Sequence, residues 1–177
     1  YVGFVSSGGP AKTKGNVINP WDMISEFGAD TVRLYLLVSS QVWLPKRFDK
    51  RQIPQVTGDF FRALRNTYEF FRLYAARVDG APPRASRPEA DQWILSRLES
   101  TVAAATRSWA GYEPTAGVRA LMDFVVDDLS NWYVRISRDR FWAPDGEADA
   151  AATATLWECL VVVSRLMAPA APFASDW

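Results

Sequence analysis

The sequence of 177 residues contains no histidine and only one cysteine. Histidine is the most common general base and zinc ligand, so its absence excludes a Ser-His-Asp or Cys-His mechanism carried by this chain alone. The single cysteine, Cys159, excludes an internal disulfide and a Cys-rich zinc site, and its apolar helical surroundings predict a buried, inert thiol. We therefore expect no metal site and name no catalytic residue.

The chain also lacks an excess of charge and a long apolar run. Its 20 basic and 20 acidic residues cancel, so any contact with RNA must come from a local patch. No apolar run approaches the ~20 residues that span a bilayer, and the first residues do not form a secretory signal. We expect a monomeric cytoplasmic protein, or a piece of one, without a membrane segment.

What the sequence does contain is mostly amphipathic helix. Asn19 before Pro20 predicts a helix start, and Gly28 predicts its end. Val32, Leu36 and Leu37 favour a second helix over residues 29–40. Further helices are expected over 59–77, 89–109, 115–142 and 148–167, and the first five residues predict a short strand that enters a loop.

Short connections between long amphipathic helices favour antiparallel neighbours. We therefore expect a mainly α fold, with two helices and a short β and loop remnant over residues 1–50 and an antiparallel helical bundle over 51–177. The proline-rich stretch 78–88 is the best linker in the sequence and a candidate boundary inside the second part.

Two motifs carry a family resemblance. After Lys12-Thr13-Lys14 the chain reads Gly-Asn-Val-Ile-Asn-Pro-Trp-Asp, and the helix that follows ends in Gly-Ala-Asp. Residues 128–142 read Asp-Leu-Ser-Asn-Trp-Tyr-Val-Arg-Ile-Ser-Arg-Asp-Arg-Phe-Trp. Both resemble the isoleucyl branch of the class I aminoacyl-tRNA synthetases: the first its mobile loop and stem-contact region, the second its anticodon-binding domain. Only residues 1–11 lie outside the resemblance.

The resemblance implies a role for the loop at the start of the chain. In the family, lysine ammonium groups of a Lys-Met-Ser-Lys-Ser loop neutralise the phosphates of ATP. Here Lys12, Thr13 and Lys14 are the corresponding residues, but Gly9, Pro10 and Ala11 replace the first half of the loop. A natural degenerate homologue and a loop that was cut or replaced both fit this departure. ATP and Mg²⁺ belong to the full family enzyme, and we expect no cofactor in this chain.

The resemblance also divides the chain by function. Residues 1–50 correspond to the end of the catalytic core with the stem-contact region, and residues 51–177 to the anticodon-binding bundle. In the first part, the side chains expected to hold the stem-contact region together are those of Trp21, Asp22, Gly28, Ala29, Asp30 and Arg33. Asp30 and Arg33, three residues apart, are expected to pair within their helix.

Arginine and aromatic side chains gather near the end of the longest predicted helix. Together they offer the phosphate charge and the stacking planes that single-stranded RNA requires. The candidates for tRNA binding are Arg135, Arg138, Arg140, Trp132, Tyr133 and Trp142. The alternatives are core packing for Trp132 and Tyr133 and, for the arginines, pairing with Asp127, Asp128 or Glu158 or a favourable place at a helix C-terminus.

The expected function is therefore tRNA binding, with tRNA-Ile as the expected partner. The chain would be a piece, or a truncated homologue, of an enzyme that joins isoleucine to its tRNA with ATP, and it would be inactive alone. A non-catalytic helical interaction module is the alternative. A third hypothesis is an active enzyme assembled from this chain and a separate catalytic half.

Overall fold

The computed structural model describes residues 18–41, 43–44, 48–74, 80–142 and 149–176, and these residues form helices and connections without a strand. The expected strand and the loop residues Lys12, Thr13 and Lys14 lie outside the described residues. In chain order the elements are α1 (Pro20–Phe27), α2 (Ala29–Val38), α3 (Gln52–Tyr74), the 3₁₀ turn η1 (Arg84–Ser86), α4 (Glu89–Ala110), α5 (Pro114–Asp123), the π-helix η2 (Phe124–Val134), α6 (Arg138–Phe141), α7 (Ala150–Met167) and α8 (Pro172–Asp176).

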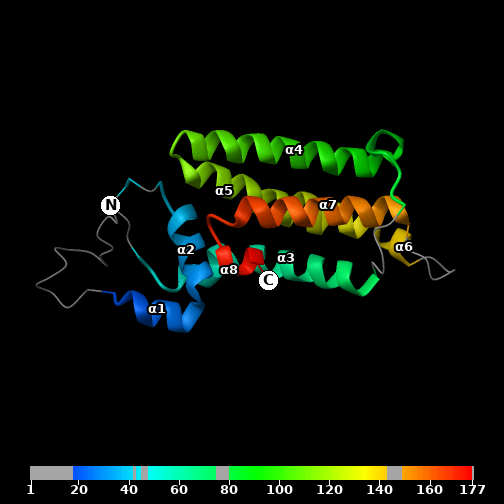
Figure 1. Ribbon diagram of the computed structural model, residues 1–177. Coiled ribbons are helices and arrows are strands. Elements are labelled where there is room, and N and C mark those ends of the chain that lie inside the picture. Colours follow the sequence, from blue (N-terminus) through cyan, green and yellow to red (C-terminus); the bar gives the residue numbers. More distant parts are fainter. Residues whose placement is uncertain (1–17, 42, 45–47, 75–79, 143–148, 177) are drawn as a thin grey trace, which may run out of the picture.

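The long helices lie side by side as a bundle (Figure 1). Helix α4 packs against α5, η2 and α7, while α3 packs against η2 on the opposite side of the fold. The short helices α1 and α2 lie at one end of the bundle, and α6 lies at the other (Figure 1). The mainly α architecture expected from the helical periodicity is confirmed.

The local signals at the ends of α1 are also confirmed. The side chain of Asn19 accepts a hydrogen bond from the backbone N–H of Trp21, and Pro20 fills the first helical position, where an N–H has no partner. Gly28 follows with a φ of 84°, which an L side chain rarely adopts, and its N–H donates to Ile24. Trp21 itself is 74% exposed. The expectation that Trp21 helps to hold this region together is therefore wrong.

Helix α3 begins at Gln52, several residues before the expected start. The buried residues Ile53, Thr57 and Phe60 continue the apolar stripe toward the N-terminus at helical spacing. Pro54 lies in the first turn, where its missing N–H leaves no hydrogen bond unmade. The expectation from sequence placed the start too late because this stripe is interrupted by threonine and proline.

The single helix expected over 115–142 consists of α5, η2 and α6 in succession. Phe124, Leu129 and Val134 are all buried and recur every five residues. A π-helix, with its i→i+5 hydrogen bonds, keeps such positions closer to one face than an α-helix does. The spacing of the buried residues is thus consistent with a π-helix. The helix is interrupted at Ser137, and α6 begins at the next residue.

Two apolar cores meet at α2. Leu34 and Val38 of α2 join the main core of the bundle, which includes Phe124, Leu129 and Leu156. Val32 and Tyr35 face a smaller core with Met23, Phe48 and Ile53. Helix α2, from the segment expected to belong to the first domain, therefore shares the core of the second.

Polar contacts join the same two parts, and they differ from the expectation. Arg33 donates to the backbone carbonyl of Pro169 at 2.8 Å, and Asp30 accepts from the backbone N–H of Ala174 at 2.6 Å. The expected pairing of Asp30 with Arg33 is wrong, because the turn after α7 offers Arg33 a backbone partner and α8 offers Asp30 another. Helix α2 is thus fixed to the far end of the chain.

Helix α7 runs through the centre of the fold. Of the described helices, it alone has the length and apolar composition that could span a bilayer, and 56% of it is buried within the fold. The central helix of a bundle has such a composition without any membrane, because it is apolar on most sides. Cys159 of α7 is fully buried, as expected, and burial raises the pKa of its thiol.

Candidate nucleic-acid interface

The RNA-binding candidates lie at the end of the bundle formed by the last turns of η2, helix α6, the first turns of α4 and the second half of α3. Four of the six candidate side chains are exposed there: Trp132, Arg135, Arg138 and Trp142. The other two, Tyr133 and Arg140, have structural partners. The structure therefore leaves four exposed candidates for contact with RNA and assigns the other two to contacts within the fold.

Tyr133 lies in the core. Its side chain has no exposed surface, and its hydroxyl donates to Asp91 Oδ1 at 2.8 Å. Burial, together with the neighbouring carboxylate, raises the pKa of Tyr133. A base cannot stack on a ring without exposed surface, so the structure corrects Tyr133 from an RNA-binding candidate to a core residue.

Arg140 holds the end of the bundle together. It donates two hydrogen bonds to the fully buried carboxylate of Asp91, at 2.6 and 2.8 Å, and a third to Asp149 Oδ2 at 2.9 Å. The hydrogen bonds to Asp91 raise the pKa of Arg140 despite its partial burial. Since a guanidinium held by two carboxylates has little capacity left for a phosphate, Arg140 is likewise corrected to a structural role.

The exposed candidates Arg138 and Trp142 rest on α3. The guanidinium of Arg138 lies over the ring of Phe70 at 5.9 Å, and Trp142 meets Tyr74 edge-on with ring centroids 5.9 Å apart. Phe141 anchors α6 between them by packing against Phe70 at 5.1 Å. Sequence reasoning assigned the α3 aromatics to a core stripe and did not expect them to support this surface.

Trp132 lies on the α4 side of the same end. Its ring contacts that of Trp93 in α4, with centroids 4.1 Å apart and planes inclined by 48°. One turn after Trp93 in α4, Arg97 donates to Asp128, which lies one turn before Trp132 in η2, at 2.9 Å. Sequence reasoning missed Trp93, because nothing in the local pattern of α4 indicates which helix faces it.

The two exposed arginines among the candidates have no described counter-charge. Neither Arg135 nor Arg138 has an ion pair with a described residue, whereas Arg97 and Arg140 do. Exposed guanidinium groups can bind phosphate, and exposed indole rings can stack on bases. The four exposed side chains thus offer charge and stacking surface for a nucleic acid.

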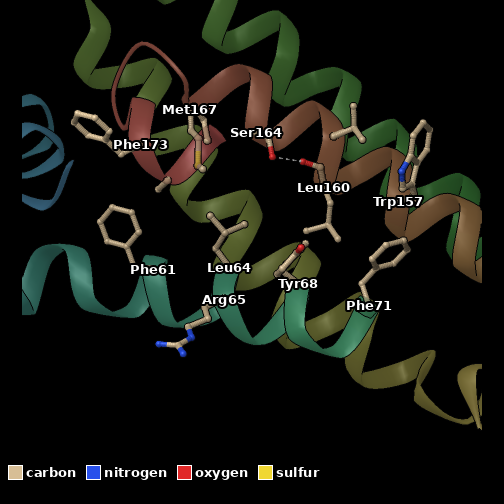
Figure 2. A pocket seen from close by; sticks show the side chains of 13 residues that line it. Phe61, Leu64, Arg65, Tyr68, Phe71, Trp157, Leu160, Ser164, Met167 and Phe173 are labelled. Atoms are coloured by element: carbon tan, nitrogen blue, oxygen red, sulfur yellow. Dashed lines mark hydrogen bonds between the residues drawn. The ribbon is translucent and has the colours of Figure 1, made fainter. Parts of the chain in front are cut away.

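A second surface feature is an open, largely apolar groove of about 730 Å³ between α3, α7 and α8. Figure 2 shows Leu64 and Phe71 of α3 facing Leu160 and Met167 of α7 across it, while Arg65 points away from its floor. The hydroxyl of Ser164 is occupied, since it donates to the carbonyl of Leu160 at 2.9 Å. The lining of the groove is thus mostly apolar, and its polar groups include the hydroxyl of Tyr68. In the part of the chain that the structure describes, no group of three or more histidine, cysteine or acidic side chains could hold a metal ion.

The chain is similar in sequence to known tRNA ligases. Residues 91–177 match the family described as the anticodon-binding domain of tRNA ligase. The isoleucine–tRNA ligase of Thermus thermophilus is 44% identical over 171 residues, and that of Deinococcus radiodurans is 46% identical over 170. Each match covers 94% of this chain and 16% of the relative, so the chain spans about a sixth of the length of these relatives.

Solved structures show the same fold at lower identity. Mycobacterium tuberculosis methionyl-tRNA synthetase bound by methionyl-adenylate superposes with a TM-score of 0.78 at 18% identity, over 98% of this chain and 36% of that one. The leucyl enzyme in a ternary complex from Agrobacterium radiobacter K84, agnB2 LeuRS with tRNA and LeuAMS, gives 0.69 at 24% identity, over 94% of this chain and 20% of that one. All candidates from Trp93 to Trp142 fall within the matched family region.

Proposed function

Since residues 91–177 of this chain belong to the anticodon-binding domain family of tRNA ligases, we propose that the chain binds tRNA as part of an isoleucine–tRNA ligase. The observation that carries the proposal is the identity of 41–46% to isoleucine–tRNA ligases over 94% of the chain. ATP-dependent joining of isoleucine to tRNA-Ile is then the activity of the longer protein. Lys12, Thr13 and Lys14 then derive, by resemblance, from the loop that binds the phosphates of ATP in the family.

Four exposed side chains at one end of the bundle are the proposed RNA contacts. Arg135 and Arg138 supply charge that no described acid neutralises, and Trp132 and Trp142 supply rings that are 38% and 56% exposed. A local patch of this kind can bind RNA although the whole chain has no net charge, because screening confines the attraction to about 8 Å at physiological salt.

The first test is binding of the full chain to a tRNA-Ile transcript as a function of salt. Phosphate contacts release counterions, so log K should fall linearly with log salt. Replacing both Arg135 and Arg138 by glutamine should reduce the magnitude of that slope by about 1 to 2, since each lost contact removes roughly 0.7 to 0.9. Arg107→Gln, in the last turn of α4 at the opposite end of the bundle, is the matched control and should leave the slope unchanged.

Absence of salt-sensitive binding at micromolar concentration would contradict the proposal and favour the helical interaction module instead. A tRNA for a different amino acid tests specificity in the same assay. We propose preference for tRNA-Ile and a monomeric chain, which sedimentation of the free and bound chain would measure.

A further inference from the structure

Trp93 and Trp132 form an exposed aromatic pair on the opposite side of α6 from α3. Their ring centroids are 4.1 Å apart, and 37% and 38% of the two residues remain open to solvent. The aromatic residues that are buried in the core, such as Phe124, are 7% exposed or less. The pair is therefore partly open, and each indole retains surface that a further planar group can reach.

Contacts on both sides hold the pair in place. Two residues before Trp93, Asp91 accepts the hydroxyl hydrogen bond of Tyr133, which is the residue next to Trp132. One turn away in each helix, Arg97 and Asp128 form an ion pair at 2.9 Å. These interactions fix the relative register of α4 and η2, so a ligand that binds to the pair loses little free energy in ordering it.

Arg135 supplies a positive charge that a nucleotide phosphate can bind. Arg135 is exposed, lies three residues after Trp132 and has no ion pair with a described residue. The nearest acid before Trp132 in η2 is Asp128, which Arg97 neutralises. An exposed indole and, three residues later, an exposed guanidinium without an ion pair to a described residue are the two groups that an unpaired base and its phosphate require. The apolar groove that would suit a partner helix lies elsewhere, between α3 and α7.

We propose that the Trp93–Trp132 pair is a preformed stacking platform for one unpaired base of a bound RNA, with Arg135 neutralising the adjoining phosphate. The inference rests on the proposed RNA-binding function and adds to it a subsite shared by α4 and η2. That subsite is distinct from the surface that Arg138 and Trp142 form on α3.

The test uses the full chain with two probes, a tRNA-Ile transcript and a short single-stranded RNA that contains one 2-aminopurine. Trp93→Leu and Trp132→Leu should each weaken binding by roughly tenfold, the range for loss of one stacked base, without changing the salt slope. Trp93→Phe and Trp132→Phe should recover most of the affinity because they keep a ring. The matched control is Trp157→Leu, a change at a 44% exposed tryptophan in the α7 groove, and it should have no effect.

Circular dichroism and urea unfolding establish that each variant is folded. Unchanged affinity in folded Trp93→Leu and Trp132→Leu chains overturns the platform and leaves the pair as a packing contact or a surface for protein. Equal loss in Trp157→Leu also overturns it. If the wild-type chain shows no salt-sensitive RNA binding, the proposed function itself fails, which distinguishes the two failures.

A second readout does not require these leucine variants to fold. Stacking on an indole quenches 2-aminopurine, so a Trp142→Leu chain, which lacks the other exposed candidate ring, should still quench the labelled RNA at saturation. No quenching by that chain contradicts the platform.

Discussion

Arg138 and Arg140 lie two residues apart, and their environments are opposite. Arg138 is exposed over the face of Phe70, while Arg140 is bound to the buried carboxylate of Asp91. One arginine is thus free to meet a phosphate, and the other holds α6 against α4. Spacing along the helix does not distinguish them, since both follow the same motif.

This difference predicts opposite effects of the same substitution. Arg140→Met should lower the free energy of unfolding by about 3 kcal/mol, because it leaves the carboxylate of Asp91 buried without a counter-charge. Arg138→Met should cost about 0.5 to 1 kcal/mol, the value of an exposed cation–π contact. Urea denaturation of both variants measures this. Equal losses would show that Arg140 is not a structural residue.

Asp149 gives the same end of the bundle a pH dependence. Burial raises the pKa of Asp149, but hydrogen bonds from Arg140 and from the backbone of Ala152 and Ala151 outweigh burial and leave that pKa below its ordinary value of 3.8. A carboxyl with a lower pKa in the folded state stabilises the fold above its unfolded pKa, and it loses that stabilisation as pH falls through the folded pKa. The free energy of unfolding should therefore decrease below about pH 4.

Asp149→Asn tests this contribution of Asp149 to the free energy of unfolding, because asparagine still caps α7 but carries no charge. The variant should be less stable than the wild type at pH 7 and should lose less stability between pH 5 and pH 3. Urea unfolding at each pH measures it, with the exposed Asp176→Asn as control. Parallel pH profiles for the wild type and Asp149→Asn would contradict the prediction.

At the scale of elements, α4 and α5 approach each other closely at Gly117. A Cβ added at Gly117 would lie 2.8 Å from Ser108 Cβ and 3.1 Å from Ala105 Cα. The backbone N–H of Gly117 also donates to Ser108 Oγ at 2.8 Å. Glycine at this position therefore sets how closely the two helices approach.

Gly117→Ala should accordingly destabilise the fold by about 1 to 3 kcal/mol, the cost of an overpacked core. Gly58→Ala is the matched control, because it also lies within a helix but no atom lies within 4 Å of its added Cβ. That change should stabilise the chain by about 0.5 to 1 kcal/mol through the higher helix propensity of alanine. Thermal and urea unfolding compare them, and stabilisation by both would contradict the close contact.

At the scale of the whole molecule, α2 connects the two apolar cores and the two ends of the chain. Thr115 donates to the carbonyl of Leu37 at 2.8 Å, and Arg119 donates to that of Val38 at 3.0 Å. Together with Arg33 and the main-core residue Leu34, these contacts bind α2 to the bundle. The described residues should therefore unfold as one unit.

Arg33→Met tests this coupling. It removes the donor to the carbonyls of Pro169 and Ala170 and should cost about 1 to 3 kcal/mol. Far-UV circular dichroism and tryptophan fluorescence should still report one coincident transition. Arg62→Met, which breaks only an exposed pair with Asp59, should change stability by less than about 0.5 kcal/mol. Separate transitions for the two probes would show that α1 and α2 form an independent unit.

The sequence alone indicated most of the helices and the similarity of the chain to tRNA ligases. Asn19, Pro20 and Gly28 fixed α1 because capping depends on residues within one turn, and the motif near Trp132 indicated the anticodon-binding domain. The start of α3 was the least predictable boundary, since Thr57 and Pro54 interrupt a stripe whose burial depends on α2.

Only the tertiary structure decided which candidates can face RNA. Asp91 lies 42 residues from Tyr133 and 49 from Arg140, and its carboxylate accepts hydrogen bonds from both. Neither side chain is therefore available to RNA. Trp93 reaches Trp132 from another helix in the same way. Helical periodicity relates residues only within a few turns of one helix, so it cannot show which distant side chains meet. That is decided by how the helices pack.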